Sequence, residues 1–345
     1  MKHFVLMFAT LGMLFACTPE DNGNNGGGGQ NNEEELTVTG EALDVTAYSA
    51  TLTGYANLPF ELGDAEVGIM YDKVQSFESA KKVAATELDG NNKFTVTATD
   101  LEPSTKYYYK SYVQNGMAFK YGAVKTFTTQ ESKCPAGAVD LGIVMTREDG
   151  TTYNLYWAKS NLSESGLCPN PEDYGDYYAW GETETKMEYT WINYQFRTSG
   201  DSYSTVKFSK YNTSNDYGPV DDKTVLEAED DAAHVKLGGK WRMPTDEEWT
   251  ELRTKCAWTW KTNYNGTGIN GRLVTAPNGN SIFLPAAGCR YDTSLGGAGI
   301  IGDYWSSSLY TGYPNYAWYV YFYSDDVSRF DINRYYGQSV RPVTE

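Results

Sequence analysis

Histidine and basic residues are scarce in this chain. It has 2 His among 345 residues, and 28 Lys and Arg against 45 Asp and Glu, for a formal net charge of −17. Binding to nucleic acid needs clustered positive charge that displaces counterions from phosphates, so this balance argues against DNA or RNA as a partner. His3 lies in a predicted signal peptide, which leaves His234 as the histidine of the mature chain. A zinc site built on several histidines is therefore excluded, and a Ser-His-Asp or Cys-His catalytic pair would have to use His234.

The N-terminal apolar run is too short to span a bilayer. It covers the thirteen residues from Phe4 to Ala16, whereas a membrane-spanning helix needs about 20. The run follows Lys2 and His3 and is typical of a signal peptide over residues 1–16. It ends at Leu14-Phe15-Ala16-Cys17, which resembles a bacterial lipobox; the alternative is an ordinary secretory signal followed by an unmodified cysteine. In a lipobox the cysteine is acylated, so we expect Cys17 to carry the lipid that anchors the protein to a membrane.

The segment from Cys17 to residue 35 predicts a flexible tether. Residues 18–35 have no apolar side chain that could join a core, and they include the run Gly26 to Gly29. Such a chain has a root-mean-square reach of about 23 Å, which lifts the folded part away from the headgroups. Glu20 and Asp21 resemble the export signal of surface lipoproteins in Bacteroidota-type bacteria. We therefore expect the protein to be lipid-anchored in the cell envelope, at the outer membrane and exposed at the surface.

Residues 36–130 show the alternation of a β-sandwich. Period-two apolar runs are separated by Gly, Pro and Asn-Gly turns, a pattern that predicts an all-β, immunoglobulin-like antiparallel fold. The segment from Leu101 to Tyr107 resembles the corner before the sixth strand of a fibronectin type III domain. We predict that Tyr107 is a tyrosine corner, whose hydroxyl bonds to the backbone a few residues upstream. We interpret this region as a spacer, with direct ligand binding as the alternative.

Residues 134–345 predict a second domain of the α+β class. All 9 Trp lie beyond residue 150. Thr245 and Glu248 form a capping-box pattern at the start of a helix, and Trp249, Leu252 and Cys256 follow on one face. A second short helix is predicted from Glu227 to Val235. The predicted strands are 155–157, 177–180, 281–284, 304–308 and 316–322.

The same region resembles the Fibrobacter succinogenes major paralogous domain. The motifs that carry the resemblance occur in order: Val139-Asp-Leu-Gly142, Glu172 to Glu182, Asp230 to His234, Gly238 to Trp249, Asn278 to Gly288, Asp303 to Ser308 and Gly337 to Val343. That family looks like a branch of the C-type lectin-like fold and is similar to formylglycine-generating enzymes in its Trp-Arg-Met-Pro-Thr segment. The resemblance implies a secreted or surface protein and no particular activity.

The resemblance also bears on metal and catalytic residues. The reactive cysteine pair of formylglycine-generating enzymes lies near the C-terminus, and this chain has no Cys after Cys289. The calcium-binding loop of calcium-dependent lectins is not matched either. A calcium site could instead be built from Asp325, Asp326 and Asp331, although an acidic run on a loop is more often a solvated face. We therefore expect no cofactor, with calcium as the alternative.

An aromatic and polar stretch provides the candidate ligand site. Tyr310, Tyr313, Asn315 and Tyr316 lie where C-type lectin-like folds place their ligand loops. Rigid rings offer contact area at low entropic cost, and amides offer directional hydrogen bonds, as a sugar or peptide site requires. The alternative is that these residues belong to the core, because the following run from Trp318 to Phe322 is typical of a buried strand.

Four cysteines remain after Cys17, an even number that permits two disulfides in an exported protein. We favour Cys134 with Cys168 and Cys256 with Cys289, with a packed thiol at Cys256 as the alternative. The function we expect is non-catalytic recognition of an external glycan or protein, in adhesion or at the envelope. The alternatives are an enzyme on a formylglycine-generating-type scaffold and a purely structural envelope protein.

Overall fold

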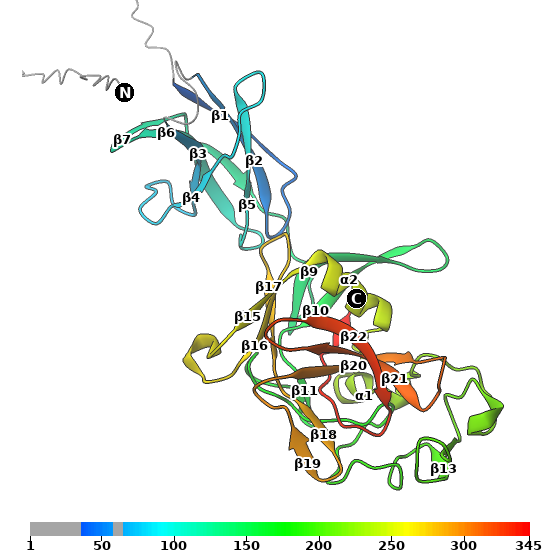
Figure 1. Cartoon of the computed structure of the whole chain (residues 1–345). Coiled ribbons are helices and arrows are strands. Elements are labelled where there is room, and N and C mark those ends of the chain that lie inside the picture. The colour runs from blue at the N-terminus through cyan, green and yellow to red at the C-terminus, as the bar shows by residue number, and fades with distance from the viewer. Residues whose placement is uncertain (1–35, 58–64) are drawn as a thin grey trace, which may run out of the picture. The chain divides into compact units, whose positions relative to one another are not determined.

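The computed structural model describes residues 36–57 and 65–345. The predicted signal peptide, the lipid attachment site Cys17 and the tether lie outside the described residues. Among those described, no helix has the length and apolar character needed to cross a membrane. The chain is predominantly β, with its strands distributed over several small sheets (Figure 1).

Eight strands precede residue 130 in the described ranges 36–57 and 65–130. They are β1 (Thr37–Leu43), β2 (Ala50–Ala56), β3 (Glu66–Asp72), β4 (Lys81–Ala84), β5 (Lys93–Ala98), β6 (Lys106–Asn115), β7 (Ala118–Tyr121) and β8 (Lys125–Thr128). One sheet has the order β1-β2-β5, and the other has the order β4-β3-β6-β7 with β8 also paired to β6. All pairings are antiparallel.

Alternating side chains of both sheets form one apolar cluster. In β5, Phe94, Val96 and Ala98 are buried while the residues between them are exposed, because successive side chains of a strand point to opposite faces. The predicted tyrosine corner is present: the Tyr107 hydroxyl accepts a hydrogen bond from the backbone N–H of Glu102 at 2.9 Å. These features match the predicted sandwich.

The remaining strands and helices lie between residues 138 and 344. The longer strands are β9 (Ala138–Thr146), β10 (Thr152–Ala158), β15 (Ala257–Lys261), β16 (Gly271–Thr275), β17 (Ser281–Pro285), β20 (Gly302–Leu309), β21 (Tyr316–Phe322) and β22 (Val327–Asn333). The shorter strands are β11 (Leu162–Ser163), β12 (Gly166–Leu167), β13 (Arg197–Ser199), β14 (Lys207–Phe208), β18 (Cys289–Tyr291), β19 (Ser294–Gly296) and β23 (Val343–Thr344). The helices are α1 (Ala232–Leu237) and α2 (Asp246–Lys255), with 3₁₀ turns at Asn215–Tyr217, Ala228–Asp230 and Tyr264–Gly266.

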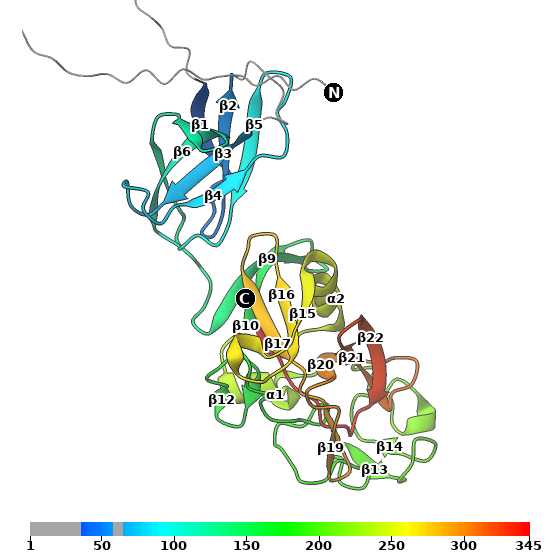
Figure 2. The same ribbon diagram turned by 60° about the vertical axis from the view of Figure 1, so that its left-hand side comes forward.

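Three antiparallel three-stranded sheets form the framework of this region. Their orders are β23-β10-β9, β15-β16-β17 and β20-β21-β22, and Figure 2 shows β15, β16 and β17 together. Among the described strands, no sheet combines strands from before and after residue 130. Two large apolar clusters fill the region, one around Trp180 and Trp305 and the other around Trp157 and Trp249.

Helix α2 begins as predicted. The Thr245 hydroxyl accepts a hydrogen bond from the Glu248 N–H, and the Glu248 carboxylate accepts one from the Thr245 N–H. Trp249 and Leu252 are buried on its inner face, and Cys256 follows as the C-terminal cap residue.

Two other predicted elements differ from the structure. The helix predicted from Glu227 to Val235 is interrupted at Asp231, which has an extended backbone and whose carboxylate caps α1 by accepting the His234 N–H. Residues 177–180 form no strand beyond a single bridge between Tyr178 and Gln338, although all four side chains are buried. The segments beside residues 177–180 are irregular loops. The four side chains are therefore buried although the segment does not pair with a neighbouring strand over its length.

Candidate functional site

The four residues predicted to bind a ligand have different environments. Tyr313 is 55% exposed, Tyr310 and Tyr316 are half-buried, and Asn315 is only 1% exposed. The rings of Tyr310 and Tyr313 lie 6.2 Å apart, and those of Tyr313 and Tyr316 lie 6.3 Å apart. The three tyrosines therefore share one surface region, whereas the expectation of an accessible Asn315 is wrong.

Asn315 is buried because hydrogen bonds from Arg334 hold its loop against the core. The fully buried guanidinium of Arg334 donates hydrogen bonds to the Pro314 carbonyl at 2.9 Å and the Tyr211 carbonyl at 2.7 Å, and the Arg334 N–H donates to the Asn315 carbonyl at 3.1 Å. This anchoring turns Asn315 inward. Its Oδ1 atom has no hydrogen-bond partner among the described residues.

A pocket of about 330 Å³ lies beside this loop. Its lining residues come from four separate segments of the chain: Thr224, Val225, Thr245, Asp246, Glu247, Ser308, Leu309, Thr311 and Trp318. We call it the Trp318 pocket. Of the stretch 310–318, only Thr311 and Trp318 line the pocket, so the predicted tyrosines border this site without forming its wall.

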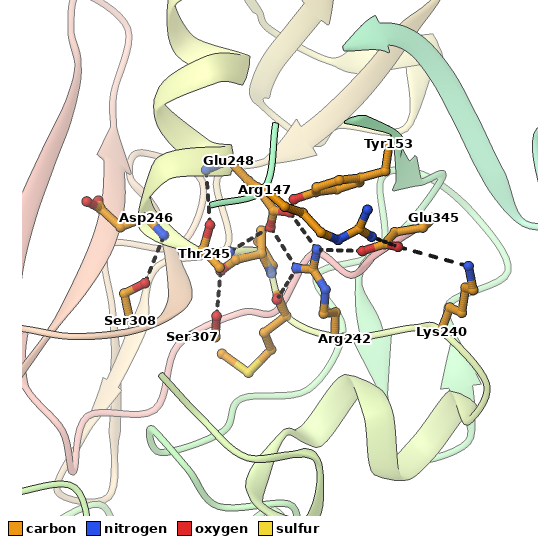
Figure 3. A network of polar contacts seen from close by, with 12 residues as sticks. Arg147, Tyr153, Lys240, Arg242, Thr245, Asp246, Glu248, Ser307, Ser308 and Glu345 are labelled. Atoms are coloured by element: carbon orange, nitrogen blue, oxygen red, sulfur yellow. Dashed lines mark hydrogen bonds and ion pairs between the residues drawn. The ribbon is translucent and has the colours of Figure 1, made fainter. Parts of the chain in front are cut away.

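The walls of the Trp318 pocket are held by the start of α2 and the end of β20. The Ser308 hydroxyl accepts a hydrogen bond from the Asp246 N–H at 3.1 Å, as Figure 3 shows. Ser308 also pairs with Val225 in an antiparallel bridge, and the Leu309 N–H donates to the Thr224 carbonyl at 2.8 Å. Backbone pairing and the Ser308 hydroxyl therefore together fix three of the segments that meet at the pocket.

Trp318 is the aromatic wall of the pocket. The Arg329 guanidinium lies 3.8 Å from the centroid of its ring, and Tyr310 packs edge-on at 4.8 Å. Arg329 also donates to the Asp246 carboxylate at 2.7 Å. Burial raises the pKa of Asp246, while the neighbouring Arg329 opposes this shift. The indole is thus oriented by neighbours on two sides.

Three polar side chains of the pocket are free to bind. The hydroxyls of Thr224 and Thr311 and the carboxylate of Glu247 form no hydrogen bond or ion pair with another side chain or backbone group in the described part of the chain. An aromatic wall, hydroxyls and a carboxylate suit a neutral polyhydroxylated ligand, since a sugar has an apolar C–H face and many hydroxyls. Sequence reasoning did not single out Thr224, Thr311 or Glu247 as site residues, and it considered Trp318 as the start of a buried strand only as the alternative interpretation of the aromatic stretch.

The predicted disulfides are absent. Cys134, Cys168, Cys256 and Cys289 are all free thiols. Cys256 packs in the apolar cluster of Trp249 and Leu252. This matches the alternative prediction of a packed thiol at this position. Burial and the adjacent Asp303 carboxylate raise the pKa of Cys289 to about 12. These two surroundings keep the Cys289 thiol protonated at neutral pH.

The predicted calcium ligands do not converge. Of the described residues, only Glu227, Glu229 and Asp230 bring three carboxylate oxygens within 4.8 Å of one another, and Asp325, Asp326 and Asp331 form no such group. The Lys210 ammonium lies within 2.8 Å of all three grouped carboxylates. A side-chain cation therefore lies among the three carboxylates and balances part of their negative charge.

His234 lies in a different pocket, of about 260 Å³, together with Asp231, Lys240, Trp241 and Arg242. Its Nδ1 atom is 3.2 Å from the Trp241 carbonyl oxygen, so the proton of the neutral ring is on Nδ1. No hydroxyl or thiol of the described residues is hydrogen-bonded to the ring. This geometry provides no activated nucleophile.

No family model matches the chain, and no curated protein is similar to it. Similar solved structures include the sensor domain of the anti-sigma factor RsgI4 of Pseudobacteroides cellulosolvens, at 24% identity over 28% of this chain and 94% of that domain, with a TM-score of 0.24. They also include human fibronectin type III domains, one from KIAA0970 and the third of KIAA0343. The first is 15% identical over 29% of this chain and 77% of its own length, with a TM-score of 0.22.

The third fibronectin type III domain of KIAA0343 is 19% identical over 34% of this chain and 98% of its own length, with a TM-score of 0.21. The structural neighbours thus include fibronectin type III domains, and strands β1–β8 form the two antiparallel sheets expected of such a sandwich. At these identities and TM-scores, the similarities carry no conclusion about the function of this chain.

Proposed function

We propose that this protein is a surface lipoprotein whose region 134–345 binds a neutral glycan in the Trp318 pocket without cleaving it. In this proposal Cys17 carries the lipid anchor, residues 36–130 are a fibronectin type III-like spacer, and residues 134–345 are a C-type lectin-like member of the Fibrobacter succinogenes major paralogous domain family.

The observation that carries the proposal is the composition of the pocket. Trp318 offers the part of its indole ring that Arg329 and Tyr310 leave uncovered, and Thr224, Thr311 and Glu247 offer polar groups without a side-chain partner in the described part of the chain. Binding pockets commonly combine an apolar wall with a few polar groups that orient the ligand. The anchoring of the pocket walls by backbone pairing favours binding further, since a preformed site loses little entropy when it is occupied.

The test is an array of neutral and acidic glycans probed with the full-length protein, with calcium and with chelator. Replacement of the indole in Trp318→Ala is expected to reduce binding at least about tenfold, the loss of a well-packed aromatic contact. Tyr55→Ala is the matched control, because Tyr55 is an exposed tyrosine on β2 in the other region of the chain. The absence of binding to every glycan would refute the proposal and favour a structural role.

A catalytic alternative is tested in the same samples. Asp246 and Glu247 place two carboxyl groups at the pocket, and glycoside hydrolysis uses such a pair. We expect the chain length of a bound oligosaccharide to remain unchanged during prolonged incubation. Shorter products that disappear in Glu247→Gln would make the protein a glycosidase instead.

A further inference from the structure

The Trp318 pocket adjoins a second pocket. This neighbour has a volume of about 480 Å³ and is lined by Met145, Thr146, Arg147, Glu148, Asp149, Tyr153, Thr245 and Glu247. Thr245 and Glu247 line both hollows. Both hollows therefore border the first turn of α2, and we refer to the second as the Tyr153 pocket.

The Tyr153 pocket repeats the chemistry of the Trp318 pocket. The Arg147 guanidinium lies 4.2 Å from the centroid of the Tyr153 ring, as Arg329 lies 3.8 Å from that of Trp318. Each pocket therefore has an aromatic ring with a guanidinium over it, and each has carboxylates near the rim. A ligand with repeating units would meet similar contacts in both.

The aromatic ring of the Tyr153 pocket is held in place by the framework of α2. The Tyr153 hydroxyl donates to the buried Glu248 carboxylate at 2.9 Å, and the same carboxylate accepts from Arg242 at 2.6 and 2.7 Å. Figure 3 shows Tyr153 and Arg147 on one side of Thr245, and Asp246 and Ser308 on the other. Both halves of the surface are therefore fixed relative to the same helix start.

Glu247, which lines both pockets, has a side chain that is available to a ligand. The Glu247 side chain is exposed and has no partner within the described residues. The two linings share Thr245 and Glu247 and have no aromatic residue in common. A ligand that occupied both hollows would pass over these two side chains.

We infer that the two pockets form one groove that binds a linear oligosaccharide, with one sugar unit at Trp318 and a later unit at Tyr153. The inference rests on the proposed glycan-binding function and specifies its ligand: an internal stretch of a chain of neutral sugars, in place of a single terminal sugar. Glu247 lies at the middle of the bound chain, where its carboxylate can accept hydrogen bonds from sugar hydroxyls.

The experiment measures how affinity depends on chain length. Full-length protein is titrated calorimetrically with linear gluco-, manno-, xylo-, galacto- and N-acetylglucosamine oligosaccharides, each from one to six units. For the series that binds, we expect affinity to rise about tenfold or more between one unit and the length that reaches the Tyr153 pocket, and then to level off.

A blocking variant assigns that gain to the second pocket. Thr146 lies at the exposed end of β9 in the Tyr153 pocket, so Thr146→Trp fills this hollow and leaves the Trp318 pocket open. The variant should bind single units normally and lose the gain with length. Val144→Trp is the control, because Val144 is exposed on the same strand and lines neither pocket.

The outcomes separate this inference from the function on which it rests. Binding that is equal for one unit and for six, and equal in Thr146→Trp, would overturn the groove and leave the Trp318 site intact. If no sugar of any series binds, the proposed function and the groove both fail.

Discussion

Asp303 is a buried carboxyl group at the start of β20. It is 6% exposed, and burial raises its pKa to about 7, although a hydrogen bond from the Cys289 thiol opposes the shift. In the unfolded chain an Asp titrates near pH 4. As the pH rises from about 4 to about 7, the unfolded state loses this proton while the folded state keeps it, so this group lowers the free energy of unfolding by up to about 1.4 kcal/mol per pH unit.

We therefore predict that Asp303→Asn flattens the dependence of stability on pH over that interval and makes the protein more stable than wild type at pH 8. Urea unfolding at several pH values measures this. Asp325→Asn, at an exposed position of the loop before β22, is the control for the same substitution at the surface. Parallel profiles for wild type and Asp303→Asn would contradict the prediction.

Arg341 is a fully buried cation with no carboxylate partner among the residues that the structure describes. Its guanidinium donates to the Asn161 side-chain oxygen at 2.9 Å, to the Ala158 carbonyl at 3.0 Å and to the Phe283 carbonyl at 2.7 Å. A lysine has one nitrogen and cannot reach three separated acceptors. Arg341→Lys should therefore destabilise the folded state by about 3 kcal/mol or more, because buried acceptors lose their donors.

Chemical denaturation tests this prediction, and a loss below about 1 kcal/mol would show that water replaces the missing donors. The role of Arg341 was not predictable from the sequence. Its partners lie 180, 183 and 58 residues away along the chain, and no local pattern links them.

The first residues of helix α2 form its capping box and also line the Trp318 pocket. Its capping box was predicted from two residues, because the reciprocal hydrogen bonds of Thr245 and Glu248 depend only on their spacing. Thr245→Ala should cost about 1 kcal/mol of stability and Thr245→Ser much less, since serine retains the hydroxyl. Thermal unfolding of the two variants measures the difference, and equal losses would show that the methyl group is what matters.

Secondary structure could be predicted where the signal is local. The alternation of β5 and the face of α2 follow directly from residue order, and so do the positions of β17, β20 and β21. The Trp318 pocket could not be predicted in this way, because Thr224, Asp246, Ser308 and Trp318 come together only through the bridge of Val225 to Ser308 and the packing of α2. Asn315 failed as a prediction for a similar reason, since the distant Arg334 holds its loop inward.

At the scale of the whole molecule, the apolar clusters are segregated. One cluster is confined to residues 36–130, and the two others to residues 139–343. We predict two unfolding transitions in calorimetry of the full-length protein, as is common for chains with separate cores. Val96→Ala should lower one transition and Leu252→Ala the other, because each deletes buried methyl groups from a different cluster. A single transition shifted by both variants would contradict the prediction.

The Lys210 ammonium is paired with the carboxylates of Glu227, Glu229 and Asp230 in the loop before α1. Although partial burial disfavours its charge, hydrogen bonds to Asp230, Glu227 and Glu229 raise the pKa of Lys210, so the ammonium is retained at any physiological pH. The loop before α1 thus carries its own counter-ion, covalently attached. A divalent cation could reach all three of these carboxylates only by displacing the Lys210 ammonium.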